Sequence, residues 1–407
     1  MQIIVAGGGA AGLMAGGMAS RRGYDVTIIE RNDRMARKVM ITGKGRCNVT
    51  NHCPVEDFIP QVPGNGRFLY SALSAFSPQD MEDFLEEQGL RLKVERGNRV
   101  FPASDKAVDV VDTLVRFARD GGCRFRKGRV TRLCLDDGVC TGVELEDGSR
   151  MDAYAVIVAT GGRSYPQTGS TGDGYELARQ AGHTVTPLQP SLVPLVTEGA
   201  DCPRMQGLSL RNVVLAVEDT AAGKTVFRDM GELLFTHFGL SGPLVLSASA
   251  HMRDMEPGRY RAHIHLKPAL SDEQLDARLL RDLSERANQD LDNMLGGLLP
   301  RKMIPVMVER CGIPASQKCR DITRGQRDQL RRQLEDFSFV VTGFRPIEEA
   351  IVTAGGVSVK EINAKTMESK RVSGLYFAGE VLDVDAYTGG FNLQIAFSTG
   401  VAAGNHV

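Results

Sequence analysis

The opening of the chain constrains its fold more than any other segment. Residues 2–6 form an apolar run, glycines follow at Gly7, Gly9 and Gly12, and a second apolar run ends in Glu30. This pattern predicts a strand, a tight turn, a helix and a second strand, the order of a nucleotide-binding βαβ unit. Gly7 permits the turn, Gly9 lets backbone N–H groups approach a diphosphate, and Gly12 lets the helix pack closely on the strand. The sequence therefore predicts a dinucleotide site at this end of the chain.

Glu30 narrows the choice of dinucleotide. It lies about 20 residues beyond the glycines, where a carboxylate accepts hydrogen bonds from an adenosine ribose. A negative charge there disfavours the 2′-phosphate of NADP, so the motif favours FAD or NAD and does not choose between them. No second glycine motif follows a strand, and we expect no separate NAD(P)H domain. A nicotinamide donor would then bind and leave at the face that the substrate uses.

Composition limits the classes of partner. With 407 residues, 42% of them hydrophobic and 24% charged, the chain is typical of a soluble globular protein of two or three structural units. Lys and Arg number 49 against 50 Asp and Glu, for a net charge of -1, so no overall field holds a phosphate backbone. No apolar stretch approaches the roughly 20 residues that span a bilayer. We expect a small-molecule substrate, and neither nucleic acid nor membrane as a partner; the sequence leaves the oligomeric state open.

The cysteines favour a reducing compartment. Eight are scattered along the chain without a C-x-x-C pair or zinc-ligand spacing, and the N-terminus lacks a secretory signal. We therefore expect reduced thiols, no metal and a cytoplasmic location. A redox disulfide at Cys47 is disfavoured because Cys53 is five intervening residues away, without flanking symmetry.

The rest of the chain reads as helices and strands around an insertion. Residues 31–51 form a basic, glycine-punctuated segment expected to run past the cofactor; a solvated basic loop is the alternative. Ser77 and Ser104 are expected to cap helices, and residues 124–152 to form a strand meander. Further expected elements are a buried strand at 154–159, Pro-rich strands from about 188, charged helices over 271–337, a strand at 375–380 and a glycine-started helix after 390.

Several longer motifs resemble one family. They are GKGRCNVTN at 43–51, ATGG at 159–162, LFTHFGLSGP at 234–243, TAGGV at 353–357, GLYFAGE at 374–380 and TGG at 388–390. Together with the opening glycines they resemble the BaiN-like and aminoacetone oxidase-like FAD-dependent oxidoreductases, the YhiN-type flavoproteins, and the resemblance runs nearly end to end. It implies an α/β fold with a Rossmann-like, glutathione-reductase-like FAD-binding domain over 1–190 plus 340–407. An inserted β-rich domain at 191–270 and a helical domain at 271–339 would complete the chain.

The resemblance also implies where FAD binds. Glu30 would contact the adenosine ribose and Val130 the adenine, while Gly379, Glu380 and Asp383 would lie near the ribityl chain. Backbone N–H groups at the start of the last helix could stabilise charge on the flavin N1–C2=O edge. The full predicted cofactor set is Gly7, Gly9, Ala11, Gly12, Glu30, Arg31, Lys38, Gly43, Arg46, Asn48, Val130, Thr160, Gly161, Gly379, Glu380, Asp383, Asn392 and Leu393.

Catalysis would need few residues, because the flavin supplies the hydride chemistry. His237, in a glycine- and proline-flanked turn of the insertion, is the candidate proton donor or acceptor; a histidine that fixes the loop by hydrogen bonds is the alternative. We expect an FAD-dependent oxidoreductase that transfers a hydride between a small organic substrate and flavin N5, with NAD(P)H as a candidate donor. A flavin-dependent RNA-modifying enzyme and a non-catalytic flavin-binding protein are the alternatives; the balanced charge disfavours the first.

Overall fold

The computed structural model describes all residues, 1–407, and divides into two compact units. Unit 1 comprises Met1–Ser191 and Pro346–Val407, and unit 2, Leu192–Arg345, is inserted in it. The second boundary falls at Arg345, later than the expected 340, because strand β17 (Phe337–Phe344) pairs with two strands of unit 2. Each unit is described below by itself.

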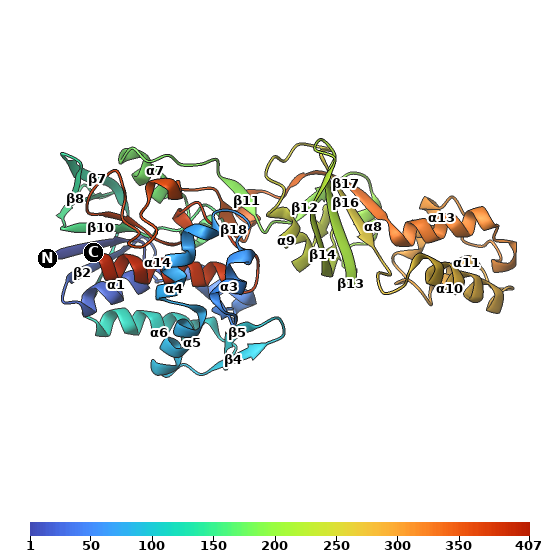
Figure 1. The fold of residues 1–407 in the computed structure, drawn as a ribbon, viewed down its shortest axis with the longest axis horizontal. Coiled ribbons are helices and arrows are strands. Elements are labelled where there is room, and N and C mark those ends of the chain that lie inside the picture. Colours follow the sequence, from blue (N-terminus) through green and yellow to red (C-terminus); the bar gives the residue numbers. More distant parts are fainter. The chain divides into compact units, whose positions relative to one another are not determined.

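A five-stranded parallel sheet forms the centre of unit 1 (Figure 1). Its spatial order is β19-β10-β1-β2-β6. The strands are β1 (Gln2–Ala6), β2 (Asp25–Glu30), β6 (Arg124–Lys127), β10 (Ala155–Val158) and β19 (Leu375–Phe377). Because β19 comes from the C-terminal segment, the unit is discontinuous in sequence, and the predicted Rossmann-like α/β fold is confirmed. The expected meander begins later than predicted, since β6 joins the parallel sheet beside β2.

Helices α1 (Ala10–Arg21) and α14 (Phe391–His406) lie side by side in unit 1 (Figure 1). The contact is close because α14 carries glycine where it crosses α1: a Cβ at Gly400 would lie 2.4 Å from the carbonyl oxygen of Ala11. Helix α6 (Ala107–Asp120) packs on α1 as well. The last helix thus anchors the C-terminal segment to the first βαβ unit.

Smaller elements surround this sheet. Ser77 caps α5 (Pro78–Glu87) with a capping box, as predicted. Ser104 does not cap α6, because the N-cap of that helix is Lys106 and its first helical residue is Ala107. The other helices are α2 (Arg37–Ile41), α3 (Val55–Phe58), α4 (Tyr70–Ala75), α5 (Pro78–Glu87) and α7 (Asp173–Gln180). Two three-stranded antiparallel sheets contain β3 (Thr50–Asn51), β5 (Arg99–Pro102) and β4 (Leu92–Glu95), and β7 (Val130–Asp136), β8 (Val139–Leu145) and β9 (Arg150–Asp152).

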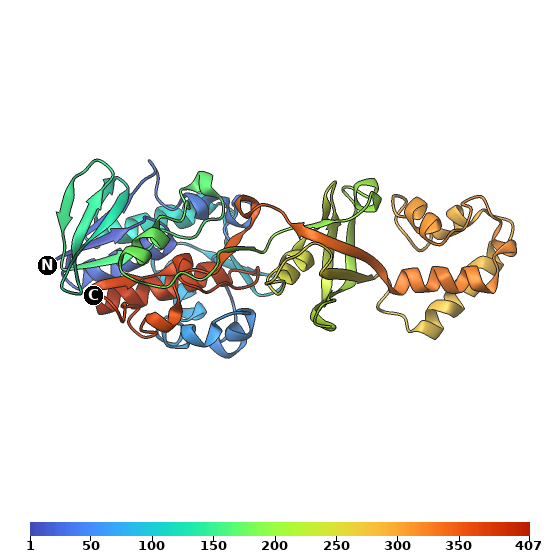
Figure 2. The same ribbon diagram turned by 90° about the horizontal axis from the view of Figure 1, so that it is seen from above.

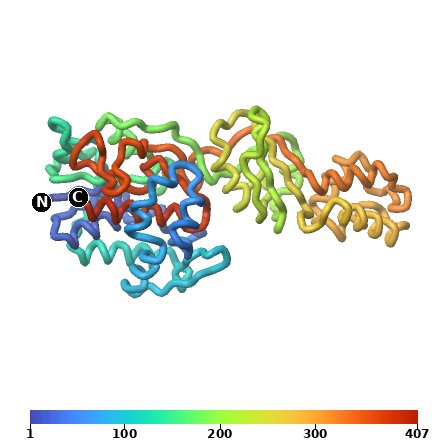
Figure 3. The backbone as a smooth tube through the Cα atoms, in the orientation of Figure 1, coloured from blue at the N-terminus to red at the C-terminus, as the bar shows by residue number.

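A two-stranded antiparallel ribbon joins the two ends of the insertion to unit 1. Its strands are β11 (Gln189–Ser191) and β18 (Val352–Ala354). The two chain termini lie near each other in unit 1, as the tube in Figure 3 shows. Arg22 holds the C-terminal end by donating to the carbonyl oxygens of Gly404 and Val407.

Unit 2 is built on a closed six-stranded barrel, with β17 running from the helices into the barrel (Figure 2). In order around the barrel the strands are β12 (Leu195–Thr197), β15 (Gly239–Ser241), β14 (Lys224–Phe235), β13 (Ser209–Asp219), β16 (Tyr260–His265) and β17. The helices are α8 (Asp201–Arg204), α9 (Pro243–Ser249), α10 (Asp272–Glu285), α11 (Leu291–Leu295), α12 (Ile304–Arg310) and α13 (Arg324–Glu335). Barrel and helices share one continuous hydrophobic core. None of the helices in the structure combines the length and apolar character needed to cross a bilayer.

A buried histidine links α7 to the C-terminal segment of unit 1. The His183 ring nitrogens lie 3.0 Å from Glu361 Oε2 and 2.7 Å from Ser369 Oγ. Two backbone N–H groups, those of Arg371 and Val372, already donate to the serine oxygen, so its hydroxyl hydrogen is left for the imidazole. This polar network therefore ties segments together, and burial lowers the pKa of His183.

The network predicts a loss of stability in mild acid. The unfolded chain, with a histidine pKa of about 6.5, takes up this proton at a higher pH than the folded protein does. The free energy of unfolding should therefore fall by up to about 1 kcal/mol between pH 7.5 and 5.5. Thermal unfolding of the wild type and of His183→Gln at both pH values checks this, and an equal acid effect in the variant would assign the loss to other groups.

Candidate functional site

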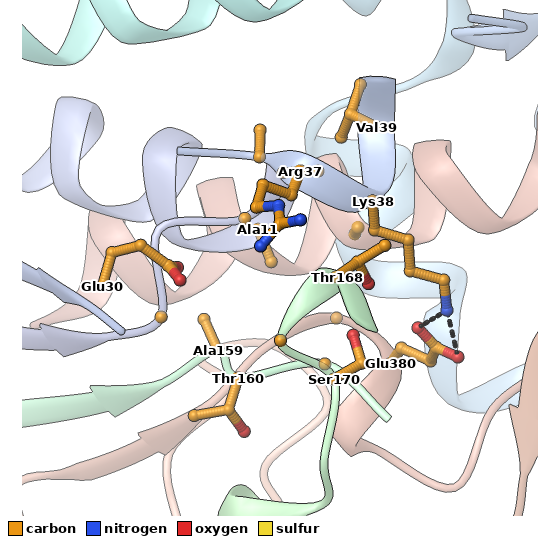
Figure 4. Close-up of a pocket in the computed structure, with 18 of the residues that line it drawn as sticks. Ala11, Glu30, Arg37, Lys38, Val39, Ala159, Thr160, Thr168, Ser170 and Glu380 are labelled. Atoms are coloured by element: carbon orange, nitrogen blue, oxygen red, sulfur yellow. Dashed lines mark hydrogen bonds and ion pairs between the residues drawn. The ribbon is translucent and has the colours of Figure 1, made fainter. Parts of the chain in front are cut away.

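A cavity in unit 1 opens at the carboxyl ends of the parallel strands, where Rossmann-type folds bind ligands (Figure 4). Its walls are formed by the β1–α1 turn, the end of β2, α2, the start of β7, the segments after β10 and β19, and the start of α14. The predicted residues that line it are Gly7, Gly9, Ala11, Glu30, Arg31, Lys38, Val130, Thr160, Gly161, Gly379, Glu380, Asn392 and Leu393. Most of the predicted set therefore converges on one place.

The carboxylate of Glu30 is held in a fixed orientation at one end of the cavity. Oε2 accepts a hydrogen bond from Gly8 N–H at 2.9 Å, and Oε1 accepts from the backbone N–H and the amide Nδ2 of Asn32 at 2.9 and 2.7 Å. The residue is 8% exposed. A carboxylate offers about four lone pairs, so one remains for a ligand hydroxyl.

The glycines at the start of α1 have different roles. A Cβ at Gly12 would lie 1.9 Å from the carbonyl oxygen of Gly7, so this position serves the packing of helix on strand and lies outside the cavity lining. At Gly9, the N-cap of α1, a Cβ would meet nothing within 4 Å and would project into open space. The first N–H groups of a helix lack intrahelical acceptors and bind anions. The turn therefore presents bare backbone to a ligand phosphate.

An ion-pair cluster that we did not predict forms the wall near Glu30. Arg129 makes a bidentate pair with Asp173 at 2.9 and 2.8 Å, and Arg31 lies 3.2 Å from the same carboxylate. Burial by itself would raise the pKa of Asp173, but the two guanidinium groups outweigh it and lower that pKa. Asp173 opens α7, and Arg129 directly precedes the predicted Val130. The cluster joins three segments around one end of the cavity.

Lys38 and Glu380 form a second ion pair, away from Glu30 in Figure 4. Lys38 Nζ lies 2.8 Å from Glu380 Oε2, and both side chains are about one-fifth exposed, at 22% and 19%. Glu380 Oε1 also accepts from Ser164 Oγ at 3.1 Å and from Thr353 N–H at 2.9 Å. The carboxylate is thus shared by the α2, β10 and β18 segments and positions all three around the cavity.

One buried hydroxyl in the cavity wall has no partner. Thr160 Oγ1 is buried and makes no hydrogen bond, although Thr160 lines the cavity. An unsatisfied buried polar atom is costly unless a ligand completes it. Thr160 Oγ1 faces α7, where a Cβ at Gly174 would lie 2.2 Å from it, so it is the open space at Gly9 and the oriented carboxylate of Glu30 that fit a bound dinucleotide such as FAD.

Besides Gly12, four predicted residues lie outside the cavity lining: Gly43, Arg46, Asn48 and Asp383. Arg46 is ion-paired with Glu95 and Asp105, the latter at 2.6 Å, and stacks on Phe101. These contacts hold the 42–46 loop on the β4–β5 hairpin. The amide oxygen of Asn48 is buried without a hydrogen-bond partner. Asp383 contributes its backbone carbonyl, which accepts from the amide of Asn65 at 2.7 Å.

The side chain of Asn392 is fully used within the protein. Its Oδ1 accepts from Ala386 N–H at 2.9 Å, and its Nδ2 donates to the carbonyl oxygens of Ala386 and Tyr387 at 2.7 and 3.2 Å. Gly390, with φ 99°, caps α14 just before it. Asn392 therefore shapes the loop that precedes α14, and only its backbone is left to face a ligand.

The catalytic candidate His237 belongs to unit 2. It is exposed and makes no hydrogen bond or ion pair; its ring packs edge-on against Phe238. Thr236 holds this turn by hydrogen bonds with Gly239, so the alternative of a loop-fixing histidine is wrong. The imidazole is exposed and has no hydrogen-bond partner.

All eight cysteines are free thiols. Cys47 is completely buried, and burial raises its pKa to about 12. The thiolate is the reactive form, so this residue is inert as a nucleophile.

Two solved structures have a fold similar to that of this chain. The chain aligns over 100% of its length with 77% of "a flavocytochrome c3 fumarate reductase", at 19% identity and TM-score 0.54. It aligns over 99% of its length with 96% of a 3-ketosteroid-delta4-(5alpha)-dehydrogenase from Rhodococcus jostii RHA1, at 13% identity and TM-score 0.53. Fold and cavity together define a Rossmann-type nucleotide-binding protein.

The family follows from the sequence comparison. The chain belongs to the family described as "HI0933-like protein Rossmann domain", which it matches over residues 1–406. The predicted resemblance to YhiN- and BaiN-like flavoproteins is thereby confirmed.

Two curated relatives match almost end to end. A "Ribosomal RNA dihydrouridine synthase" of Escherichia coli (strain K12) is 34% identical over 97% of this chain and 95% of its own length. A "3-dehydro-bile acid delta(4,6)-reductase" of Clostridium scindens is 31% identical over 99% of this chain and 98% of its own length. The relatives thus share a family and differ in their named substrates.

Proposed function

We propose that this protein is an FAD-dependent oxidoreductase that transfers a hydride between a small organic substrate and flavin N5. The observation that carries the proposal is the cavity of unit 1, where an oriented acid and a bare helix start lie at the ends of parallel strands. When bound there, FAD supplies the hydride chemistry. The protein's task is to hold the dinucleotide and to position the substrate.

Different residues of the cavity would bind different parts of FAD. Glu30 would accept hydrogen bonds from the adenosine ribose, and the start of α1 would bind the diphosphate. The Lys38–Glu380 pair and Thr160 lie toward the ribityl chain in this assignment. Leu393 and the first N–H groups of α14 would face the isoalloxazine ring and favour negative charge there.

His237 is proposed as the group that exchanges a proton with the substrate. Its support is that it is exposed and makes no hydrogen bond, while Thr236 and Gly239 maintain the turn that presents it. An imidazole changes charge near neutral pH, which suits it to this role.

The names of the relatives favour the reductive direction. A delta(4,6)-reductase and a dihydrouridine synthase both add hydrogen across a carbon–carbon double bond. We therefore propose an electron-poor double bond, conjugated with a carbonyl group, as the reacting group of the substrate. NAD(P)H is the proposed donor, at the same face as the substrate.

A second candidate function is the modification of RNA. It is favoured by the two relatives named ribosomal RNA dihydrouridine synthase, 34% and 32% identical to this chain. The net charge of -1 speaks against it, because an RNA would have to be held by local charges alone. This reaction would leave dihydrouridine within an RNA chain, a product that reduction of a small organic substrate does not give.

The flavin spectrum tests the proposal first. The purified protein should be yellow, and its flavin bands should bleach when NADH or NADPH is added without oxygen. A steroid 4,6-dien-3-one added next should restore the bands if the substrate is a small enone; a uridine-containing ribosomal RNA should restore them in the second case, with dihydrouridine detected by mass spectrometry.

Each outcome separates the alternatives. Bands that persist with both nicotinamides point to another donor or to substrate-driven oxidation. Bleaching that no acceptor reverses favours a flavin-binding protein without turnover. A colourless protein that cannot be reconstituted with FAD would sink the proposal.

A further inference from the structure

Most charged side chains in the cavity form ion pairs, and Glu30 and Arg37 do not. Seven charged side chains line it: Glu30, Arg31, Arg37, Lys38, Arg129, Asp173 and Glu380. Asp173 holds Arg31 and Arg129, and Glu380 holds Lys38. Glu30 is bound by N–H groups, without a cation. Arg37 forms no salt bridge: its hydrogen bond is to Asn32 Oδ1 at 3.0 Å, and its charge adds only weakly to that of Lys127 in lowering the pKa of the exposed Asp33.

Arg37 lies where a negative ligand group would be expected. In the view of Figure 4 it lies between Glu30 and the Lys38–Glu380 pair, and like Ala11 it lines the cavity. The first turn of α1, which contains Ala11, presents the N–H groups that favour anions. A cation and a helix start that line the same cavity can together bind two adjacent phosphates.

The position of Arg37 is prepared by the fold. Helix α2 begins after Ala36, a non-glycine residue at φ 52°, whose N–H donates to the carbonyl oxygen of Gly8 at 2.8 Å. Asn32, which holds the Arg37 guanidinium, also donates to Glu30 Oε1 at 2.7 Å. One asparagine therefore links this cation to the carboxylate proposed for the ribose.

We propose that Arg37 binds the diphosphate of FAD and that the adjacent Lys38 does not. Lys38 is neutralised by Glu380, whereas a guanidinium without a carboxylate pairs readily with phosphate. The inference rests on the proposed function, since it takes FAD as the ligand. It makes Arg37 the main source of electrostatic affinity for the cofactor, so the retention of FAD should depend on salt.

The test uses the purified holoprotein and FAD as the probe. Arg37→Gln should raise the dissociation constant of FAD about tenfold, the loss of one charge-assisted contact worth roughly 1.4 kcal/mol. The value is obtained by diluting the holoprotein and recording the fluorescence of released FAD. Arg34→Gln is the matched control: it removes an exposed arginine of the same segment that does not line the cavity.

Salt and rescue complete the design. Raising the ionic strength should weaken FAD binding to the wild type and to Arg34→Gln, and much less to Arg37→Gln. Arg37→Lys should recover part of the affinity and also guards against a Gln variant that does not fold. Equal dissociation constants and equal salt dependence for Arg37→Gln and Arg34→Gln would overturn the inference on Arg37. A wild type that retains no FAD would instead overturn the proposed function.

Discussion

Replacing Gly12 by alanine should destabilise unit 1 severely and leave the protein without flavin. The added Cβ would lie 1.9 Å from the carbonyl oxygen of Gly7 and 3.1 Å from its carbonyl carbon, backbone atoms that cannot yield without moving α1 off the sheet. Overpacking of this kind costs about 3 kcal/mol. For a unit of this size we expect the unfolding temperature to fall by on the order of 10 °C. Differential scanning calorimetry and the flavin absorbance of the purified variant measure both effects.

Gly9→Ala is the matched control, because it adds the same methyl group to the same turn. Gly9 has φ -82° and ψ -168°, which alanine adopts without strain, and its Cβ would meet no protein atom within 4 Å. The unfolding temperature without cofactor should therefore stay close to that of the wild type, while FAD affinity falls, since the methyl group enters the space assigned to the diphosphate. Normal FAD affinity in Gly9→Ala would show that the ligand does not approach this turn closely.

Replacing Lys38 by methionine should give the second large effect. The variant leaves the carboxylate of Glu380 in the cavity wall with Ser164 and the Thr353 N–H but without its cation. Removing one member of a largely buried pair strands the other charge, and we expect a loss of about 2 kcal/mol in the free energy of unfolding. Urea unfolding followed by circular dichroism gives this value.

A double variant separates the stranded charge from general damage. Lys38→Met combined with Glu380→Gln removes both charges and keeps an amide that can accept from Ser164 and Thr353. If the pair is the cause, the double variant should be more stable than Lys38→Met, with a coupling of about 1 kcal/mol or more in the double-mutant cycle. Strictly additive losses would contradict the role assigned to this pair.

The sequence was most informative where local pattern and chemistry coincide. The apolar run 2–6, the spaced glycines and Glu30 correctly predicted β1, the turn, α1 and the end of β2. These elements could be predicted because a βαβ unit is formed by residues that follow one another in the sequence. Thr160 and Glu380 were found through longer motifs of the family resemblance. They lie far apart along the chain, and only the parallel pairing of β10 with β19 brings them together.

The site residues that we did not predict are defined by ion pairs, or by the lack of one, with residues far away in the sequence. Arg129 and Asp173 meet because the start of β7 lies beside the start of α7. Arg37 was passed over in favour of Arg31 and Lys38, and no sequence signal says which cation in a basic segment has a carboxylate partner. Arg46 was expected at the cofactor, yet its acids come from the β4–β5 hairpin and the residues after it.

The discontinuity of unit 1 has a consequence for its biosynthesis. When the ribosome has made Met1–Ser191, the central sheet lacks β19 and α1 lacks the helix that covers it. The whole of Leu192–Arg345, which has its own core, must be translated before those missing pieces appear. Unit 2 can therefore fold while the nascent nucleotide-binding half still exposes apolar surface, the state in which chains aggregate and chaperones engage them. The cavity, whose lining includes Glu380 and the start of α14, is therefore completed only after Leu192–Arg345 has been translated.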